Sequence, residues 1–175
     1  YGNQSKQTLR TIPREVPGRP FANKTSFEFV VDDYNEYFLN QLFELLTEYG
    51  PIHEVWFDGA HPKRKGGQTY NYAAWKKLIH TLAPKAPIFG REDIRWCGNE
   101  SGRTRQTEWN VIPYSINPDT ANHFADLTDV DLGGREKLTK AKYLHYQQAE
   151  VNTSIREGWF YRDDTHQKTR SADDV

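Results

Sequence analysis

The sequence has 175 residues, with 23 lysines and arginines against 24 aspartates and glutamates, and 36% of the residues are hydrophobic. This balance predicts one soluble domain or part of a larger one, and the near-neutral charge argues against a nucleic-acid partner. Cys97 is the single cysteine, which excludes an intrachain disulfide, and no apolar run approaches the roughly 20 residues of a membrane span.

Residues 1–31 have no regular hydrophobic period. Pro13, Pro17 and Pro20 interrupt the segment, and several arginines and lysines lie among them. Because proline fixes φ and lacks a backbone N–H, this composition predicts an irregular Pro/Arg-rich connection or insertion. We therefore place the start of the regular domain at residue 32.

Helices and strands alternate in the next part of the chain. A helix is predicted over residues 32–49, because Asp32 or Asp33 can cap it and Gly50-Pro51 stops it. A short β-prone run follows over residues 55–57, then a second helix over 71–82, then an apolar run over 86–89. A strand, a helix and a strand in this order predict a βαβ crossover with parallel strands, and hence an α/β fold.

An acidic residue, Asp58, stands where the first apolar strand becomes a turn. In parallel α/β sheets and barrels the ligand site lies beyond the carboxyl ends of the strands, so this position favours a catalytic role. The alternative is that Asp58 only begins an Asp-Gly turn.

The remaining third of the chain is less regular. Residues 94–120 predict a long loop that is too polar and too rich in glycine and proline for a helix or a buried strand. Glu100 lies in this loop as a second candidate carboxylate. Residues 137–146 predict a short helix or an extended lead-in, and residues 154–161 predict the last strand.

Aromatic residues make up 14% of the chain and include five tryptophans and ten tyrosines. Aromatic faces can cover the apolar C–H faces of sugar rings, so this content points weakly to a carbohydrate ligand. Ordinary core and surface aromatics are the alternative. The six histidines show no metal-ligand spacing, and neither a metal nor a cofactor is expected.

Three motifs in order resemble the α-L-fucosidases of glycoside hydrolase family 29. They are YNEYFLNQLFELLTEYGPIHEVWFDGA, IRWCGNESG and VNTSIREGWFY, within roughly residues 34–165. The WCGNE motif is similar to the subgroup that favours α-1,3/1,4-linked fucose. The resemblance implies a retaining exo-α-L-fucosidase that acts on fucosylated oligosaccharides or glycoconjugates through a covalent fucosyl-enzyme intermediate.

The same resemblance implies roles for individual residues. It implies that Asp58 is the nucleophile and that Glu100 is the general acid/base. It also implies that Trp159 lines the fucose pocket and that a basic residue lies near the nucleophile. The expected substrate-binding residues are Trp159, Arg91, Arg95, Trp96 and Trp56, of which Trp56 is better interpreted as scaffold beside the site.

The residue types fit this chemistry independently. A retaining glycosidase needs one ionised carboxylate to attack the anomeric carbon and one carboxylic acid to protonate the leaving oxygen, about 5 to 5.5 Å apart. Asp58 and Glu100 are 42 positions apart, so only the fold can bring them together.

A complete (β/α)8 barrel takes about 250 residues, and only three or four strand candidates are present. We therefore expect residues 32–175 to be a central part of a TIM-like barrel domain that is incomplete alone, with the remaining segments on the same or an associated chain. The alternatives are a fucose-binding, catalytically inactive homologue and a βα fragment without a site. By resemblance the protein would be secreted, periplasmic or lysosomal.

Overall fold

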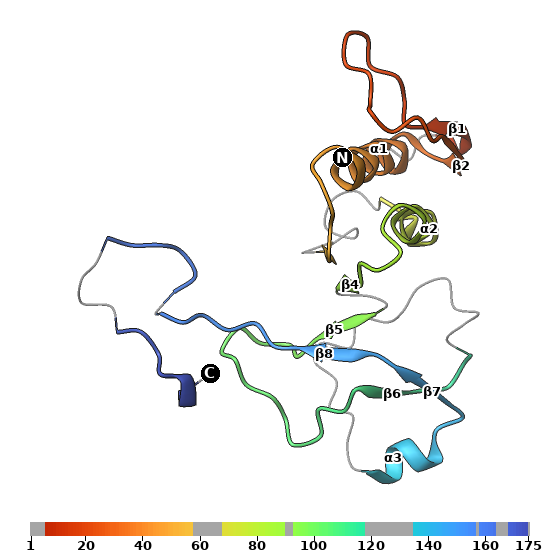
Figure 1. Ribbon diagram of the computed structural model, residues 1–175. Helices are drawn as coiled ribbons and strands as arrows, with labels where there is room; N and C mark the ends of the chain where they lie inside the picture. Colours follow the sequence, from red (N-terminus) through yellow and green to blue (C-terminus); the bar gives the residue numbers. More distant parts are fainter. Residues whose placement is uncertain are drawn as a thin grey trace. The chain divides into compact units, whose positions relative to one another are not determined.

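The computed structural model describes residues 6–57, 68–89, 93–117, 135–156, 158–163 and 168–174. The chain divides into two compact units, Tyr1–Phe89 and Gly90–Val175. The first unit contains β1 (Thr8–Ile12), β2 (Phe27–Val31), α1 (Asp33–Thr47), β3 (Val55–Trp56), α2 (Tyr72–Leu82) and β4 (Ile88–Phe89), which Figure 1 labels in part. The second contains β5 (Ile94–Trp96), β6 (Val111–Tyr114), α3 (Arg135–Lys140), β7 (Tyr143–Tyr146), β8 (Gln148–Glu150) and a 3-10 turn at Ala172–Asp174.

Strands β1 and β2 form an antiparallel hairpin, in which Thr8 pairs with Val31 and Ile12 with Phe27. The prediction of an irregular segment over residues 1–31 is therefore wrong for these two strands. Their side chains alternate between exposed positions and positions that are buried or half-buried, as a strand with one covered face requires. The prolines that suggested irregularity all lie in the connection between the strands.

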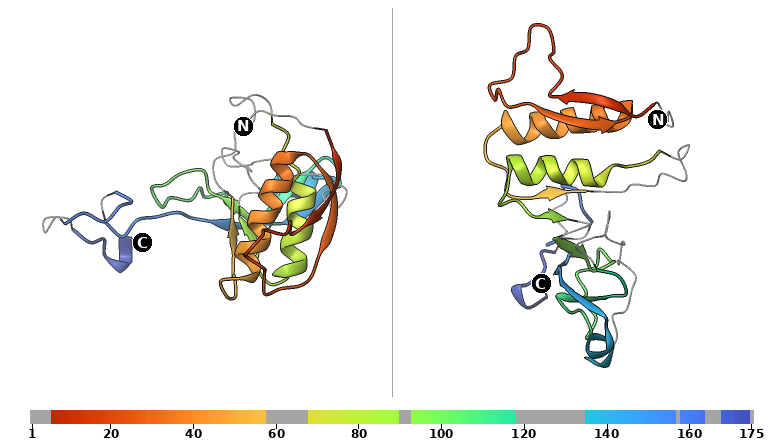
Figure 2. Two further views of the ribbon diagram at one scale, coloured as in Figure 1. Left: turned by 90° about the horizontal axis from the view of Figure 1, so that it is seen from above. Right: turned by 90° about the vertical axis from the view of Figure 1, so that its right-hand side faces the viewer.

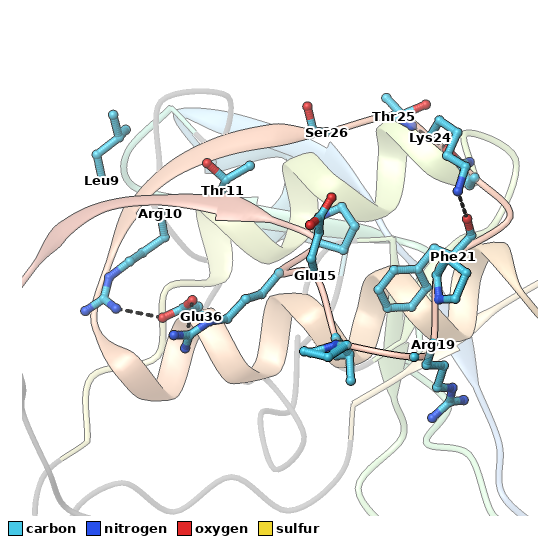
Figure 3. Close-up of a pocket in the computed structure, with 17 residues that line it drawn as sticks. Leu9, Arg10, Thr11, Glu15, Arg19, Phe21, Lys24, Thr25, Ser26 and Glu36 are labelled. Atoms are coloured by element: carbon cyan, nitrogen blue, oxygen red, sulfur yellow. Dashed lines mark hydrogen bonds and ion pairs between the residues drawn. The ribbon is translucent and has the colours of Figure 1, made fainter.

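The connection between β1 and β2 is fastened to α1 by polar contacts. The Arg19 guanidinium lies 2.5 Å from the Glu44 carboxylate, and the Glu48 carboxylate accepts a hydrogen bond from the Ala22 N–H at 3.1 Å. In the hairpin, Arg10 pairs with Glu36 at 2.8 Å (Figure 3). The connection and the hairpin border an open pocket of about 1150 Å³, and none of the predicted site residues lines it.

Helix α1 lies between the hairpin and α2 (Figure 1 and Figure 2). Its apolar face packs with α2 around Phe43, Leu39 and Leu78, all fully buried. The Phe38 ring stacks on the Trp75 indole with a centroid separation of 4.0 Å. Among the described residues, this buried cluster consists of Ile12, Phe29, Val31, Leu39, Leu42, Phe43, Leu46, Ala74, Trp75, Leu78, Ile79 and Ile88.

The predicted helix starts are confirmed, and both depend on side-chain caps. Asp32 caps α1 by accepting a hydrogen bond from the Asn35 N–H at 2.8 Å, and Asn71 caps α2 by accepting one from the Ala74 N–H at 3.1 Å. The two caps are connected, because the Asn71 N–H donates to the Asn35 side-chain oxygen at 2.8 Å. Gln68 completes the network by donating to Asp32 at 3.1 Å.

Replacing Asp32 with alanine should lower the free energy of unfolding by about 2 to 4 kcal/mol. The change removes a helix cap and also one of the two acceptors of each buried amide of Asn35 and Gln68, which keep only the Thr69 carbonyl. Asp33→Ala is the matched control, because it removes a partly exposed ion pair with Arg10 and should cost less than about 1 kcal/mol. Denaturant unfolding of both variants measures the difference, and equal losses would contradict this role of Asp32.

The predicted βαβ crossover is confirmed. Strands β3 and β4 are parallel, with Val55 opposite Ile88 and Trp56 opposite Phe89, and α2 connects them along the chain. The ladder continues by one hydrogen bond, from the Phe57 N–H to the Phe89 carbonyl at 3.4 Å. The α/β class therefore holds, whereas the TIM-like barrel stays a prediction.

The second unit contains one parallel and one antiparallel strand pair. Strand β5 pairs with β8 in parallel, with Trp96 opposite Glu150, and β6 pairs with β7 antiparallel, with Val111 opposite Tyr146. The long loop predicted over residues 94–120 therefore contains two strands. The segment 137–146 contains both predicted forms, the end of α3 and strand β7.

The predicted last strand over residues 154–161 is wrong, since its described residues contain no strand. The Ser154 hydroxyl donates to the Gly158 carbonyl at 2.8 Å and accepts from the Arg156 N–H at 3.1 Å. Gly158 has a φ of 76°, which an extended strand does not allow. In the part of the chain that the structure describes, no helix is long and apolar enough to cross a membrane.

Candidate functional site

The strand end that leads to Asp58 is held by aromatic contacts with both helices of the first unit. The ring of Phe57, the last described residue before Asp58, lies 6.1 Å from that of Phe38 in α1 and 5.9 Å from that of Trp75 in α2, measured between ring centroids. These contacts fix the chain immediately before the candidate nucleophile. Asp58 itself lies outside the described residues, as does Arg91.

Trp56, the residue before Phe57, stacks on Phe89 of β4 with a centroid separation of 4.2 Å and an interplanar angle of 9°. The Trp56 side chain is 46% exposed, so it does not belong to the core around the helices. This stacking across the parallel pair agrees with the interpretation of Trp56 as scaffold at the strand end.

The chain that follows residues 58–67 is anchored at Gln68, which is 3% exposed. Its amide donates to the Asp32 carboxylate at 3.1 Å, and the neighbouring Thr69 carbonyl accepts from the Asn35 amide at 2.9 Å. The described residues on both sides of positions 58–67 are thus held by contacts with α1. Sequence patterns did not single out Gln68 or Asn35, since their role depends on contacts more than 30 positions apart.

Arg95 of β5 is only 2% exposed and its guanidinium pairs with the Glu108 carboxylate. It also donates to the Trp109 carbonyl at 3.0 Å, and Arg105 approaches the second oxygen of Glu108 at 3.1 Å. A buried charge needs such partners, because an unpaired guanidinium would be strongly destabilised by desolvation. Among the described residues, Glu108 and the Trp109 carbonyl are therefore structural partners of Arg95. A contact between Arg95 and substrate stays a prediction.

The candidate acid/base, Glu100, lies in a turn that Asn99 holds. The Asn99 side-chain oxygen accepts hydrogen bonds from the N–H groups of Ser101 at 3.1 Å and Arg103 at 3.2 Å. The Trp96 indole N–H donates to the Asn99 carbonyl at 3.1 Å, which ties the Trp96 side chain to this turn. This arrangement projects an exposed Glu100 side chain from a fixed backbone.

The neighbouring Cys97 is buried and carries a free thiol. Burial raises the pKa of the Cys97 thiol, and the nearby Glu108 carboxylate raises it further. A thiol with a raised pKa holds its proton and is a poor nucleophile. We therefore expect Glu100, and not Cys97, to be the reactive side chain of this turn.

The structure brings Glu100 together with Trp159. The Trp159 indole N–H donates to Oε2 of Glu100 at 3.0 Å, across 59 positions of sequence. Both residues were singled out by resemblance to the fucosidases, but no local pattern indicated that they meet. Trp159 is 49% exposed, so one part of its ring stays accessible beside the carboxylate.

A close backbone approach fixes the Glu100 turn against the segment that carries Trp159. Gly102 has a φ of 74°, and a Cβ at this position would lie 2.5 Å from the Thr153 hydroxyl. The Arg170 guanidinium bonds that same Thr153 hydroxyl, and the Arg170 N–H donates to the Ile155 carbonyl at 2.8 Å. Only glycine fits position 102 without displacing Thr153.

Among the described residues, no group of three or more histidine, cysteine, aspartate or glutamate side chains could hold a metal ion. No protein-family model matches the sequence. The solved structures that resemble it include a glycoside hydrolase 29 family member from an unknown rumen bacterium, with 34% identity and a TM-score of 0.50. The shared region covers 74% of this chain and 24% of that one.

Two further similar proteins carry names that state one activity, α-L-fucosidase. A protein from Bacteroides ovatus, whose crystal structure carries a provisional assignment as an α-L-fucosidase, is 41% identical with a TM-score of 0.60, over 74% of this chain and 24% of that one. α-L-Fucosidase 1 of Arabidopsis thaliana is 37% identical over 135 residues, or 74% of this chain and 24% of the relative. The chain thus spans about a quarter of the length of the curated relatives it matches.

Proposed function

We propose that this chain is a central part of the catalytic domain of a retaining exo-α-L-fucosidase that releases terminal α-1,3/1,4-linked L-fucose from glycans. The observation that carries the proposal is the hydrogen bond between Glu100 and Trp159, 3.0 Å from indole nitrogen to carboxylate oxygen. The resemblance implies that one is the acid/base and the other a wall of the fucose pocket. Their contact supports both assignments, because a general acid has to lie beside the bound sugar.

In the proposed first step, an oxygen of Asp58 attacks the anomeric carbon while Glu100 gives its proton to the leaving glycosidic oxygen. The C1–O bond to the glycan breaks as the bond from C1 to Asp58 forms. In the second step Glu100 takes a proton from water, the water oxygen attacks C1, and the bond to Asp58 breaks. The mechanism requires the two carboxyl groups to lie about 5 to 5.5 Å apart in the assembled enzyme.

The relatives' lengths support the proposal that further barrel segments, from the same or an associated chain, complete the site. Arg91 or Arg95 is proposed to be the basic residue near Asp58 that the resemblance implies, and Trp56 is proposed to support the strand that leads to Asp58. An arginine near a carboxylate favours the ionised form that a nucleophile needs.

The assembled enzyme should hydrolyse an aryl α-L-fucoside and should cleave α-1,3- or α-1,4-linked fucose at least about tenfold faster than α-1,2-linked fucose. Initial rates on matched trisaccharides measure the preference. An active enzyme that prefers the α-1,2 linkage would contradict the subgroup assignment alone. Saturable fucose binding without turnover would instead favour the inactive, fucose-binding homologue.

A further inference from the structure

We propose that Trp159 is a positioning residue for the general acid, which acts through its indole N–H in addition to any contact of its ring with fucose. This inference rests on the proposed function. It starts from the direction of one hydrogen bond: the indole N–H is the donor and Oε2 of Glu100 is the acceptor. Indole nitrogen has no acceptor capacity, so the direction cannot reverse.

The direction of this bond decides which carboxyl oxygen carries the proton. When Glu100 is protonated, a proton on Oε2 would face the indole hydrogen, whereas a proton on Oε1 leaves the indole bond intact. In the described part of the chain, Oε1 accepts no hydrogen bond. The geometry therefore places the transferable proton on Oε1, which stays available for the leaving oxygen and later for water.

Both partners are held by their own segments, so the bond acts between two ordered groups. The Glu100 backbone is fixed by the Asn99 turn and by the close approach of Gly102 to Thr153. The Trp159 backbone follows the turn that Ser154 makes with Gly158. Without the indole bond, the exposed Glu100 side chain would gain rotational freedom and would spend less time aligned with the leaving oxygen.

Trp159→Phe removes the indole N–H donor and keeps an aromatic, though smaller, ring. For a glycan or another substrate with a poor leaving group, kcat/KM should fall roughly ten- to hundredfold, because protonation of that oxygen limits the first step. For a dinitrophenyl fucoside, whose phenolate leaves without a proton, kcat/KM should change less than about twofold. Tyr161→Phe, which removes a hydroxyl group from an exposed side chain of the same segment, should change neither value.

A double-mutant cycle separates positioning from direct binding. In a Glu100→Ala background, Trp159→Phe should have no further effect on kcat/KM for the substrate with a poor leaving group. The carboxyl group that the Trp159 indole would position is already absent there. A ring that only bound fucose would lose the same factor in both backgrounds. Since the Trp159 side chain is half exposed, the substitution leaves the buried core unchanged, and thermal unfolding of each variant checks this.

The outcomes distinguish this inference from the proposed function. A larger loss for the poor leaving group, absent in the Glu100→Ala background, supports the positioning role. An active enzyme in which Trp159→Phe impairs both substrates equally overturns that role and leaves the fucosidase assignment intact. An assembled enzyme that hydrolyses no fucoside overturns the proposed function and the role of Trp159 with it.

Discussion

Replacing Asp58 with alanine in the assembled enzyme should lower kcat on an aryl α-L-fucoside by about 10⁴-fold, while fucose binds with nearly unchanged affinity. The proposed role of Asp58 is to form the covalent bond to C1, an interaction that belongs to the transition state and the intermediate rather than to bound substrate. Steady-state kinetics and competitive inhibition by fucose measure the two quantities separately.

Added azide gives this variant a stereochemical signature. A small anion can enter the space left by the carboxylate and attack C1 from that face, which yields β-fucosyl azide with inversion. Asp33→Ala is the control, because it removes a carboxylate whose side chain is 57% exposed and lies far from any predicted site residue in sequence. Substantial turnover by Asp58→Ala without azide would contradict its assignment as the nucleophile.

Replacing Glu100 with alanine should nearly abolish cleavage of a natural glycan, by about 10²- to 10⁴-fold in kcat/KM, yet spare fucosyl-enzyme formation from an aryl fucoside with an acidic phenol. The acidic phenolate needs no proton to leave, whereas a sugar hydroxyl does. Turnover of the aryl substrate should then be limited by the second step, which has lost its base.

Azide should restore that second step because it attacks C1 without needing a base. The product should be α-fucosyl azide. Azide attacks C1 from the side of Glu100, opposite the bond to Asp58, so the configuration is retained overall. Glu136→Ala, which removes an exposed carboxylate from α3, should leave both steps unchanged. Equal impairment of both substrates and no effect of azide would exclude Glu100 as the acid/base.

The helices could be predicted because their signals are local. Asp32 and Asn71 stand at the start of runs with apolar residues at helical spacing, and each caps the helix that the spacing predicts. The parallel pair of β3 and β4 followed from the order of strand, helix and strand. The helix caps depend on near neighbours in sequence, and the parallel pair depends on the order of the elements.

The missed strands depend on partners far away in sequence. Residues 94–120 looked too polar and too rich in glycine and proline for a buried strand, but within them Glu108, 13 positions after Arg95, pairs with that buried arginine of β5. The prolines between β1 and β2 obscured the alternation of the hairpin strands on either side. The opposite error arose at residues 154–161, where aromatic residues suggested a strand and the turn at Ser154 and Gly158 prevents one.

The candidate site was only partly predictable for the same reason. Resemblance singled out Glu100 and Trp159 separately, but their hydrogen bond spans 59 positions and follows from the turns that Asn99 and Ser154 make. The pairing of Arg95 with Glu108 likewise required the fold. Residues 58 and 91 lie outside the described chain, so their proposed roles rest on the motifs.

The most direct test of the account is to trap the covalent intermediate on Asp58. A 2-deoxy-2-fluoro-fucosyl substrate with a good leaving group slows both steps, because fluorine destabilises the oxocarbenium-like transition states, and the fucosyl-enzyme should accumulate. Peptide mapping by mass spectrometry should find one fluorofucosyl group, attached to Asp58. An active enzyme that carries the label on another residue, or that turns over without any covalent label, would contradict the account.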